Sequence, residues 1–249
     1  MSQSANGRGR TLFERLTGAN KKDARPLELQ YHNPIGARVG STVAFEQEQD
    51  ISSINFVVEA LSVYQTKIQA ASFYHSDYHL KGISLEQTAP VKFRLRLIAD
   101  ENVPDQLGHR VQLLRLIAEK EFDEKFCNDV LGHAEGIISS SKVGNGYQFF
   151  IEDPDAPVEG SSKYWRVEDV LDPYNARVTI LRDTDGNGTI EDDELEKREV
   201  IYWDYSRLTN DPLSGQELTE FLTVEMDKAT KYFKFFCGKE VLPSQVAVF

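Results

Sequence analysis

Alternation of apolar and polar residues predicts β-strands along most of the chain. The clearest run is residues 91–97 (Val-Lys-Phe-Arg-Leu-Arg-Leu), which puts apolar side chains on one face of a strand and basic side chains on the other. We expect the apolar face to contact a core, and Lys92, Arg94 and Arg96 to face water. Burial of one face is typical of an antiparallel sheet.

Other runs rich in β-branched and aromatic residues also predict strands, and turns such as 144–146 and the proline-containing loop 153–157 separate them. These runs are 54–61, 67–80, 147–151, 163–167, 176–181, 198–205, 220–225 and 232–237. Residues 111–117 fit either a strand or the start of a helix. Phe122, Phe126 and Val130 recur every four residues, which predicts a helix over roughly 121–131 that ends at Gly132.

These elements indicate an α+β fold that is predominantly antiparallel β with few helices. We expect three parts along the chain. Residues 1–38 form a basic N-terminal tail with a short amphipathic segment, and residues 39–135 form a β-rich subdomain with a helix. Residues 136–249 form a second β-rich subdomain, which carries an acidic loop at 183–194.

The acidic loop 183–194 reads Asp-Thr-Asp-Gly-Asn-Gly-Thr-Ile-Glu-Asp-Asp-Glu and resembles the twelve-residue calcium loop of EF-hands. Its candidate ligands are side-chain oxygens and one backbone carbonyl, supplied by Asp183, Asp185, Asn187, Thr189, Glu191 and Glu194. The segments on either side look like strands, so we expect an EF-hand-like calcium loop inserted in a β-hairpin. Bound Ca²⁺ would then act as a structural clamp, since strands cannot open as paired helices do. The alternative is a hairpin turn without metal, because Asp, Asn and Gly are common in turns.

Composition and charge exclude several classes of protein. The 249 residues carry 40 acidic and 28 basic side chains, a net charge of −12, which argues against sequence-independent binding to nucleic acid. No apolar run approaches the roughly 18 residues that would cross a bilayer, and the first residues lack the apolar run of a secretory signal. The two cysteines exclude a disulfide framework. We therefore expect a cytoplasmic protein without a transmembrane segment.

The N-terminal tail differs in charge from the rest of the chain. Six basic and two acidic residues give residues 1–26 a net charge of +4, which leaves −16 for the remainder. A capping-box spacing predicts a short helix near residues 11–16 with one apolar face, too short to be stable alone in water. The candidate contacts with a partner or an anionic membrane are Arg10, Leu12, Phe13, Arg15 and Leu16. The alternative is a disordered tail without a role.

Other candidate sites are weaker. His75, Asp77 and His79 would share one face of a strand and could hold zinc, although a solvated strand face explains the same spacing. Cys237 follows two phenylalanines and fits a buried core position. The sequence contains no phosphate-binding loop and no nucleophile motif, so it points to no catalytic residue.

Several short segments, most of them with aromatic residues, resemble the YjfK-type family of bacterial proteins. They are 12–16 (Leu-Phe-Glu-Arg-Leu), 34–40, 163–167 (Lys-Tyr-Trp-Arg-Val), 200–207 and 238–249. Genes of that family tend to lie beside those for phage-shock-A-like membrane-stress proteins, small membrane proteins and ATP-grasp ligases. The resemblance therefore implies an accessory role at the inner face of the membrane, and it implies no reaction. The complete calcium loop is a departure from the family pattern.

Together these features predict a non-enzymatic accessory or scaffold protein of a bacterial membrane-stress assembly, with a structural Ca²⁺ site. The expected partner is a protein, either phage-shock-A-like or membrane-associated, and the location is the cytoplasm, with peripheral contact at the inner membrane as an option. Two alternatives stay open. One is a calcium-stabilised structural subunit of a larger particle, and the other is an enzyme whose active site has no recognisable motif.

Overall fold

The computed structural model describes residues 35–45, 55–68, 71–82, 91–99, 109–144, 146–167, 173–182, 195–211 and 215–249. Within these ranges most residues lie in antiparallel strands, as predicted. The helical segments in the same ranges are α3 (Glu124–Phe126), the π-helical turn η2 (Cys127–Leu131) and the 3-10 turn η4 (Pro243–Gln245). The α+β class is therefore wrong for the described part of the chain, which is essentially all β.

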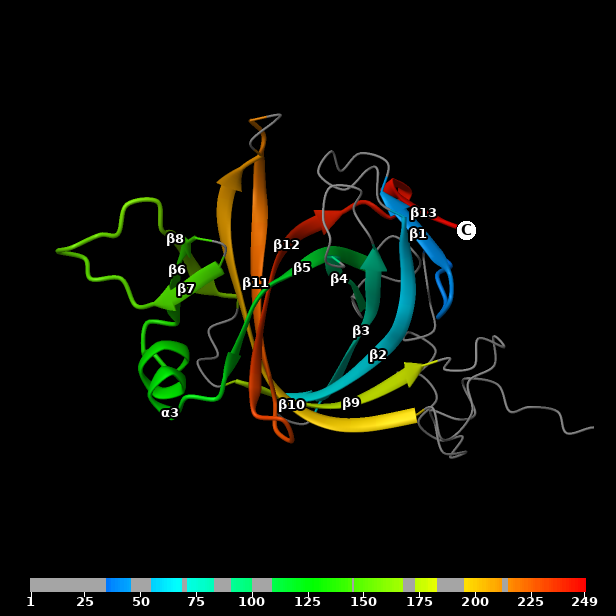
Figure 1. Ribbon diagram of the computed structural model, residues 1–249, viewed down its shortest axis with the longest axis horizontal. Coiled ribbons are helices and arrows are strands. Elements are labelled where there is room, and N and C mark those ends of the chain that lie inside the picture. The colour runs from blue at the N-terminus through cyan, green and yellow to red at the C-terminus, as the bar shows by residue number, and fades with distance from the viewer. Residues whose placement is uncertain are drawn as a thin grey trace, which may run out of the picture.

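Eight strands close into an antiparallel barrel (Figure 1). Around the ring the order is β2–β3–β4–β5–β12–β11–β10–β9, and pairing of β9 with β2 closes it. The strands are β2 (Phe56–Ile68), β3 (Ala71–Gly82), β4 (Val91–Ala99), β5 (His109–Glu121), β9 (Tyr174–Arg182), β10 (Leu195–Asn210), β11 (Glu217–Asp227) and β12 (Tyr232–Val241). The stretches 39–135 and 136–249 each contribute four of them, so both belong to one hydrogen-bonded sheet.

Smaller strands extend the sheet on two sides of the barrel, as Figure 1 shows. On one side, β1 (Thr42–Phe45) pairs with β2 and with β13 (Val246–Val248). On the other side, β8 (Ser162–Arg166) pairs with the second half of β10, and β6 (Ile137–Val143) and β7 (Gly146–Phe150) follow it. These additions cover apolar surface on the outside of the barrel.

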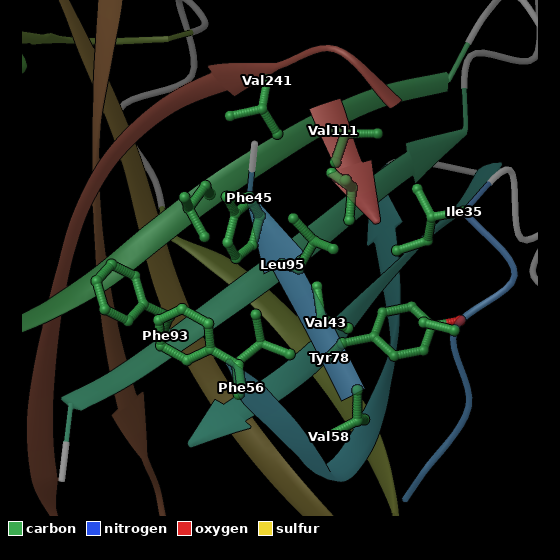
Figure 2. Close-up of a cluster of buried hydrophobic side chains, with 14 of the residues drawn as sticks. Ile35, Val43, Phe45, Phe56, Val58, Tyr78, Phe93, Leu95, Val111 and Val241 are labelled. Atoms are coloured by element: carbon green, nitrogen blue, oxygen red, sulfur yellow. The ribbon is translucent and has the colours of Figure 1, made fainter. Parts of the chain in front are cut away.

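One apolar cluster lies between the outer face of β2–β5 and the pair β1–β13. Figure 2 shows Val43 and Phe45 of β1 among side chains such as Phe93, Leu95 and Tyr78. A second cluster lies on the outer face of β10–β12, below α3 and β6–β8, and it includes aromatic residues of β12. These outer clusters carry much of the hydrophobic stabilisation that a core usually provides.

Strand β4 alternates as its sequence predicts, and Lys92 is exposed as expected, but from Phe93 to Leu97 both faces of the strand are buried. Phe93, Leu95 and Leu97 pack in the outer cluster, which confirms the apolar face. Arg94 and Arg96 are only 5% and 2% exposed, so the prediction that they face water is wrong. Because the sheet closes on itself, the face opposite the outer cluster points into the barrel and not into solvent.

The segment 109–132 combines a strand and a short helix. Residues 111–117 belong to β5, which resolves the choice between strand and helix in favour of a strand. The predicted helix begins later than expected, after Asp123, whose carboxylate accepts a hydrogen bond from the backbone N–H of Phe126. It ends at Gly132, as predicted. This short element caps one side of the barrel and does not form a helical layer.

Candidate functional site

The interior of the barrel holds a continuous row of five charged side chains with alternating sign. In order they are Glu225 of β11, Arg94 of β4, Asp77 of β3, Arg96 of β4 and Asp204 of β10. Arg94 donates to both oxygens of Glu225, at 2.7 and 3.1 Å, and to Asp77 at 3.3 Å. Arg96 donates to both oxygens of Asp77, at 2.9 and 3.2 Å, and to Asp204 at 3.3 Å. The row links four strands, and two of them, β10 and β11, are not neighbours of β4.

Two hydroxyl groups complete this charged row. The Tyr64 hydroxyl donates to Glu225 at 2.7 Å and accepts from Arg94 at 3.0 Å. The Thr223 hydroxyl donates to Asp204 at 2.6 Å and accepts from Arg96 at 3.1 Å. Charge-assisted and bidentate hydrogen bonds of this kind hold side chains in one geometry more firmly than neutral ones.

Pairing inside the barrel determines the ionisation of these groups. Burial would raise the pKa of Asp77, but Arg96 and Arg94 outweigh it and hold that pKa well below its usual range. Burial acts on Glu225 in the same way, and Arg94 with its hydrogen bonds brings the pKa of Glu225 to about 2. The pKa values of both arginines are raised, since their carboxylate partners outweigh the cost of burial. All four groups are therefore ionised near neutral pH.

Two histidines lie beside the charged row. Burial, followed by the nearby arginines, lowers the pKa of His75 and of His79 to about 3. The Nε2 atom of His79 lies 2.6 Å from the Ser62 hydroxyl, and the His75 ring stacks on Tyr64 with centroids 4.3 Å apart. Both imidazoles are therefore neutral at pH 7.

The strand face predicted for His75, Asp77 and His79 is confirmed, since their cross-strand partners on β2 share one side of the sheet. The zinc hypothesis is wrong, because both Asp77 oxygens already accept hydrogen bonds from arginines. Within the described ranges, moreover, no three His, Cys, Asp or Glu side chains form a group that could hold a metal ion. The charged row therefore serves as an internal brace, with each ionised group held by another.

A groove of about 510 Å³ opens on the outside of the barrel beside β7. Side chains and backbone from β5, β6, β7, β12 and α3 and from the loop after β7 line it, namely Ala118, Glu119, Lys120, Phe126, Ser141, Tyr147, Gln148, Phe149, Phe150, Val158 and Phe235. Phe149 stacks on Phe235 with ring centroids 4.0 Å apart, and the Lys120 ammonium lies 4.1 Å from the centre of the Phe126 ring. The groove is thus mainly aromatic, with a few polar groups.

The predicted calcium ligands Asp183, Asp185, Asn187, Thr189, Glu191 and Glu194 lie outside the described residues. The segments on either side of them are described, and both are strands, as expected. β9 ends at Arg182 and β10 begins at Leu195, where Leu195 is the cross-strand partner of Leu181. Residues 195–197 belong to β10.

The remaining residues singled out in the sequence are those of the N-terminal tail and the two cysteines. Arg10, Leu12, Phe13, Arg15 and Leu16 lie outside the described residues. Cys237 is only partly buried, with its sulfur 3.7 Å from the Tyr164 hydroxyl, and burial raises the pKa of its thiol to about 12. Burial also raises the pKa of Cys127. Neither thiol is activated as a nucleophile, since it is the thiolate that reacts.

Sequence reasoning missed the charged row. Arg94 and Arg96 alternate with apolar residues as solvent-facing groups would, and their partners Glu225 and Asp204 lie more than 100 residues away. The one local signal was Asp77, which stands between two histidines on a strand whose other face carries Tyr78 and Leu80. A buried carboxylate there requires a cation, and the arginines of the neighbouring strand are the nearest candidates.

Within the described ranges, no helix is long and apolar enough to span a membrane. A scan against protein-family models, a search of curated protein sequences and a search of solved structures each returned no match.

Proposed function

We propose that the chain is a non-enzymatic accessory or scaffold protein of a bacterial membrane-stress assembly, with a structural Ca²⁺ site at residues 183–194. The observation that carries the calcium part is the pairing of Leu181 with Leu195, which joins the two ends of the loop across adjacent strands. Twelve residues that include five side-chain oxygen donors at EF-hand spacing lie between these strand ends. A calcium ion held there would tie β9 to β10 at one end of the barrel.

The barrel interior supports a structural role over a catalytic one. A general acid or base needs a pKa near the working pH and a side chain that can reach a substrate. Asp77 and Glu225 are ionised and engaged by arginines, and the two histidines have pKa values far below neutrality. These groups stabilise one another, so the rigid barrel can present loops and termini to a partner.

Calcium titration by calorimetry tests the metal site directly. We expect calcium to bind at one site per chain in the wild-type protein. The heat of binding should be absent in the variants Asp183→Asn and Glu194→Gln. The matched control is Asp193→Asn, a carboxylate in the same loop at a position that does not coordinate in EF-hands. Absence of binding in the wild-type chain, or equal loss in the control, would remove the calcium part of the proposal.

Co-sedimentation tests the accessory role. We expect the full chain to sediment with vesicles that contain anionic lipid, or with a phage-shock-A-like protein, and we expect deletion of residues 1–25 to abolish this binding. Neutral vesicles provide the control, because the basic tail would contact anionic head groups. Equal sedimentation of the full and truncated chains would show that the tail is not the contact.

A further inference from the structure

A second row of charged side chains with alternating sign lies at the end of the barrel where β9 ends and β10 begins (Figure 1). Its members are Arg182 of β9, Glu196 and Arg198 of β10, and Asp227 of β11. The cross-strand register places all four on one side of the sheet, since Glu196 is the partner of Ile180 and Asp227 is the partner of Val200. We call these four residues the rim row.

Glu196 holds one arginine on each of its carboxylate oxygens. Its Oε1 atom accepts a hydrogen bond from Nε of Arg198 at 2.6 Å, and its Oε2 atom lies 3.5 Å from Nη2 of Arg182. The hydrogen bond from Arg198, with a smaller contribution from Arg182, lowers the pKa of Glu196. Glu196 is therefore ionised at neutral pH and pairs with both guanidinium groups.

The rim row is anchored at the end away from Arg182. Arg198 donates from Nη1 to Oδ2 of Asp227 at 2.7 Å. The other oxygen of Asp227 accepts from the backbone N–H groups of Ala229 and Thr230, at 2.8 and 3.2 Å. The Asp227 side chain is 8% exposed, whereas that of Arg182 is 45% exposed. Arg182 is therefore the least enclosed member of the row, and its ion pair with Glu196 connects it to the anchored part.

Arg182 is also the basic residue nearest in sequence to the candidate calcium loop. It directly precedes Asp183, and the loop 183–194 contains six carboxylates and no basic residue. A guanidinium group pairs well with carboxylates, often through two parallel hydrogen bonds. An unrestrained Arg182 would therefore compete with a cation for the same oxygens, and its charge would repel the cation.

We propose that Glu196 restrains Arg182 and thereby raises the affinity of the loop 183–194 for Ca²⁺. This inference rests on the proposed function, because it concerns the same calcium site. The ion pair directs the guanidinium of Arg182 toward β10, and the bonds from Glu196 through Arg198 to Asp227 hold that arrangement in place. Exposed ion pairs of this kind change an equilibrium constant by up to about fivefold, which sets the size of the effect.

Calcium titration of the full chain by calorimetry tests the restraint. We expect Glu196→Gln to weaken calcium binding about threefold, because Arg182 is released. Arg182→Gln should strengthen binding by a similar factor, because the competing charge is removed. The double variant Arg182→Gln/Glu196→Gln should bind calcium as Arg182→Gln does, since Glu196 then has no guanidinium to restrain.

The matched control is Glu199→Gln, the same change of charge on the opposite side of β10, where Glu199 pairs with Lys228. It should leave the affinity for calcium unchanged. Equal weakening in Glu199→Gln and Glu196→Gln would overturn the proposal, as would a loss from Glu196→Gln that persists when Arg182 is replaced, because net charge alone would then set the affinity. If the wild-type chain binds calcium and Glu196→Gln binds it equally well, the restraint is wrong and the calcium site stands. Absence of binding in the wild-type chain would remove both.

Discussion

Arg94 and Glu225 form a bidentate pair inside the barrel, with N···O distances of 2.7 and 3.1 Å across a sequence separation of 131 residues. The pair connects β4 with β11, two strands that are not hydrogen-bonded neighbours. It therefore spans the interior and links the two halves of the barrel wall. Buried ion pairs of this kind favour one arrangement of strands. Removing one partner lowers stability strongly, because the other charge is left buried without compensation.

Removal of one partner of this pair should destabilise the protein strongly. We expect Glu225→Ala to lower the free energy of unfolding by about 3–5 kcal/mol, because Arg94 would stay buried with only part of its compensation. The double variant Arg94→Met/Glu225→Leu should lose less free energy of unfolding than Glu225→Ala alone, since it removes both charges. Urea denaturation measures both effects.

The control for this pair is the exposed ion pair between Lys81 and Glu59, whose side chains are 47% and 46% exposed. Glu59→Ala should change the free energy of unfolding by less than about 1 kcal/mol. A loss in Glu225→Ala no larger than that in Glu59→Ala would contradict the role of the internal brace.

Stability should fall as the pH drops below about 6.5. His75 and His79 have folded-state pKa values of about 3, below the ordinary value, so the unfolded chain binds more protons between pH 3 and 6.5. Protonation of each histidine in the unfolded chain therefore lowers the free energy of unfolding by about 2 kcal/mol between pH 6.5 and 5. Below about pH 4.5 Asp77 and Glu225 act in the same direction, because their pKa values are also lowered on folding.

Urea denaturation at pH 7, 6 and 5 checks this dependence. We expect His79→Asn to reduce the slope of stability against pH in that range. A flat profile from pH 7 to 5 in the wild-type chain would contradict the lowered pKa values of the two histidines, because the folded and unfolded chains would then bind equal numbers of protons.

Gly238 of β12 lies directly against the backbone of β5. A Cβ atom at this position would lie 1.8 Å from the carbonyl oxygen of Leu113, so the backbone itself would have to move. We expect Gly238→Ala to destabilise the chain by about 3 kcal/mol or more. Gly146→Ala is the control, because its Cβ would meet no atom closer than 4.0 Å. Equal melting temperatures of the two variants would refute this close packing.

The two thiols should react slowly in the folded protein. Burial raises the pKa of Cys237 to about 12, and it also raises the pKa of Cys127, so the thiolate fraction at pH 8 is small. We expect iodoacetamide to modify both thiols more than tenfold faster in urea than in buffer, as measured by mass spectrometry. Rapid labelling of folded Cys237 would mean that its environment activates the thiol.

Local sequence patterns predicted most strands but not the closure of the sheet. The alternation in residues 91–97 placed β4 and its apolar face correctly. It could not show that the other face is also buried, because that depends on β9 pairing with β2 and on carboxylates far along the chain. The helix near residue 126 was located correctly but was shorter than predicted, since Glu121 is taken into β5.

Thermal unfolding in chelator and in millimolar calcium tests the central claim most directly. If residues 183–194 bind Ca²⁺ and tie β9 to β10, calcium should raise the melting temperature of the wild-type chain, and Glu194→Gln should lose that rise. Asp193→Asn should keep it. Equal melting temperatures with and without calcium in the wild-type chain would contradict the proposed calcium site and leave the loop as an acidic connection between two strands.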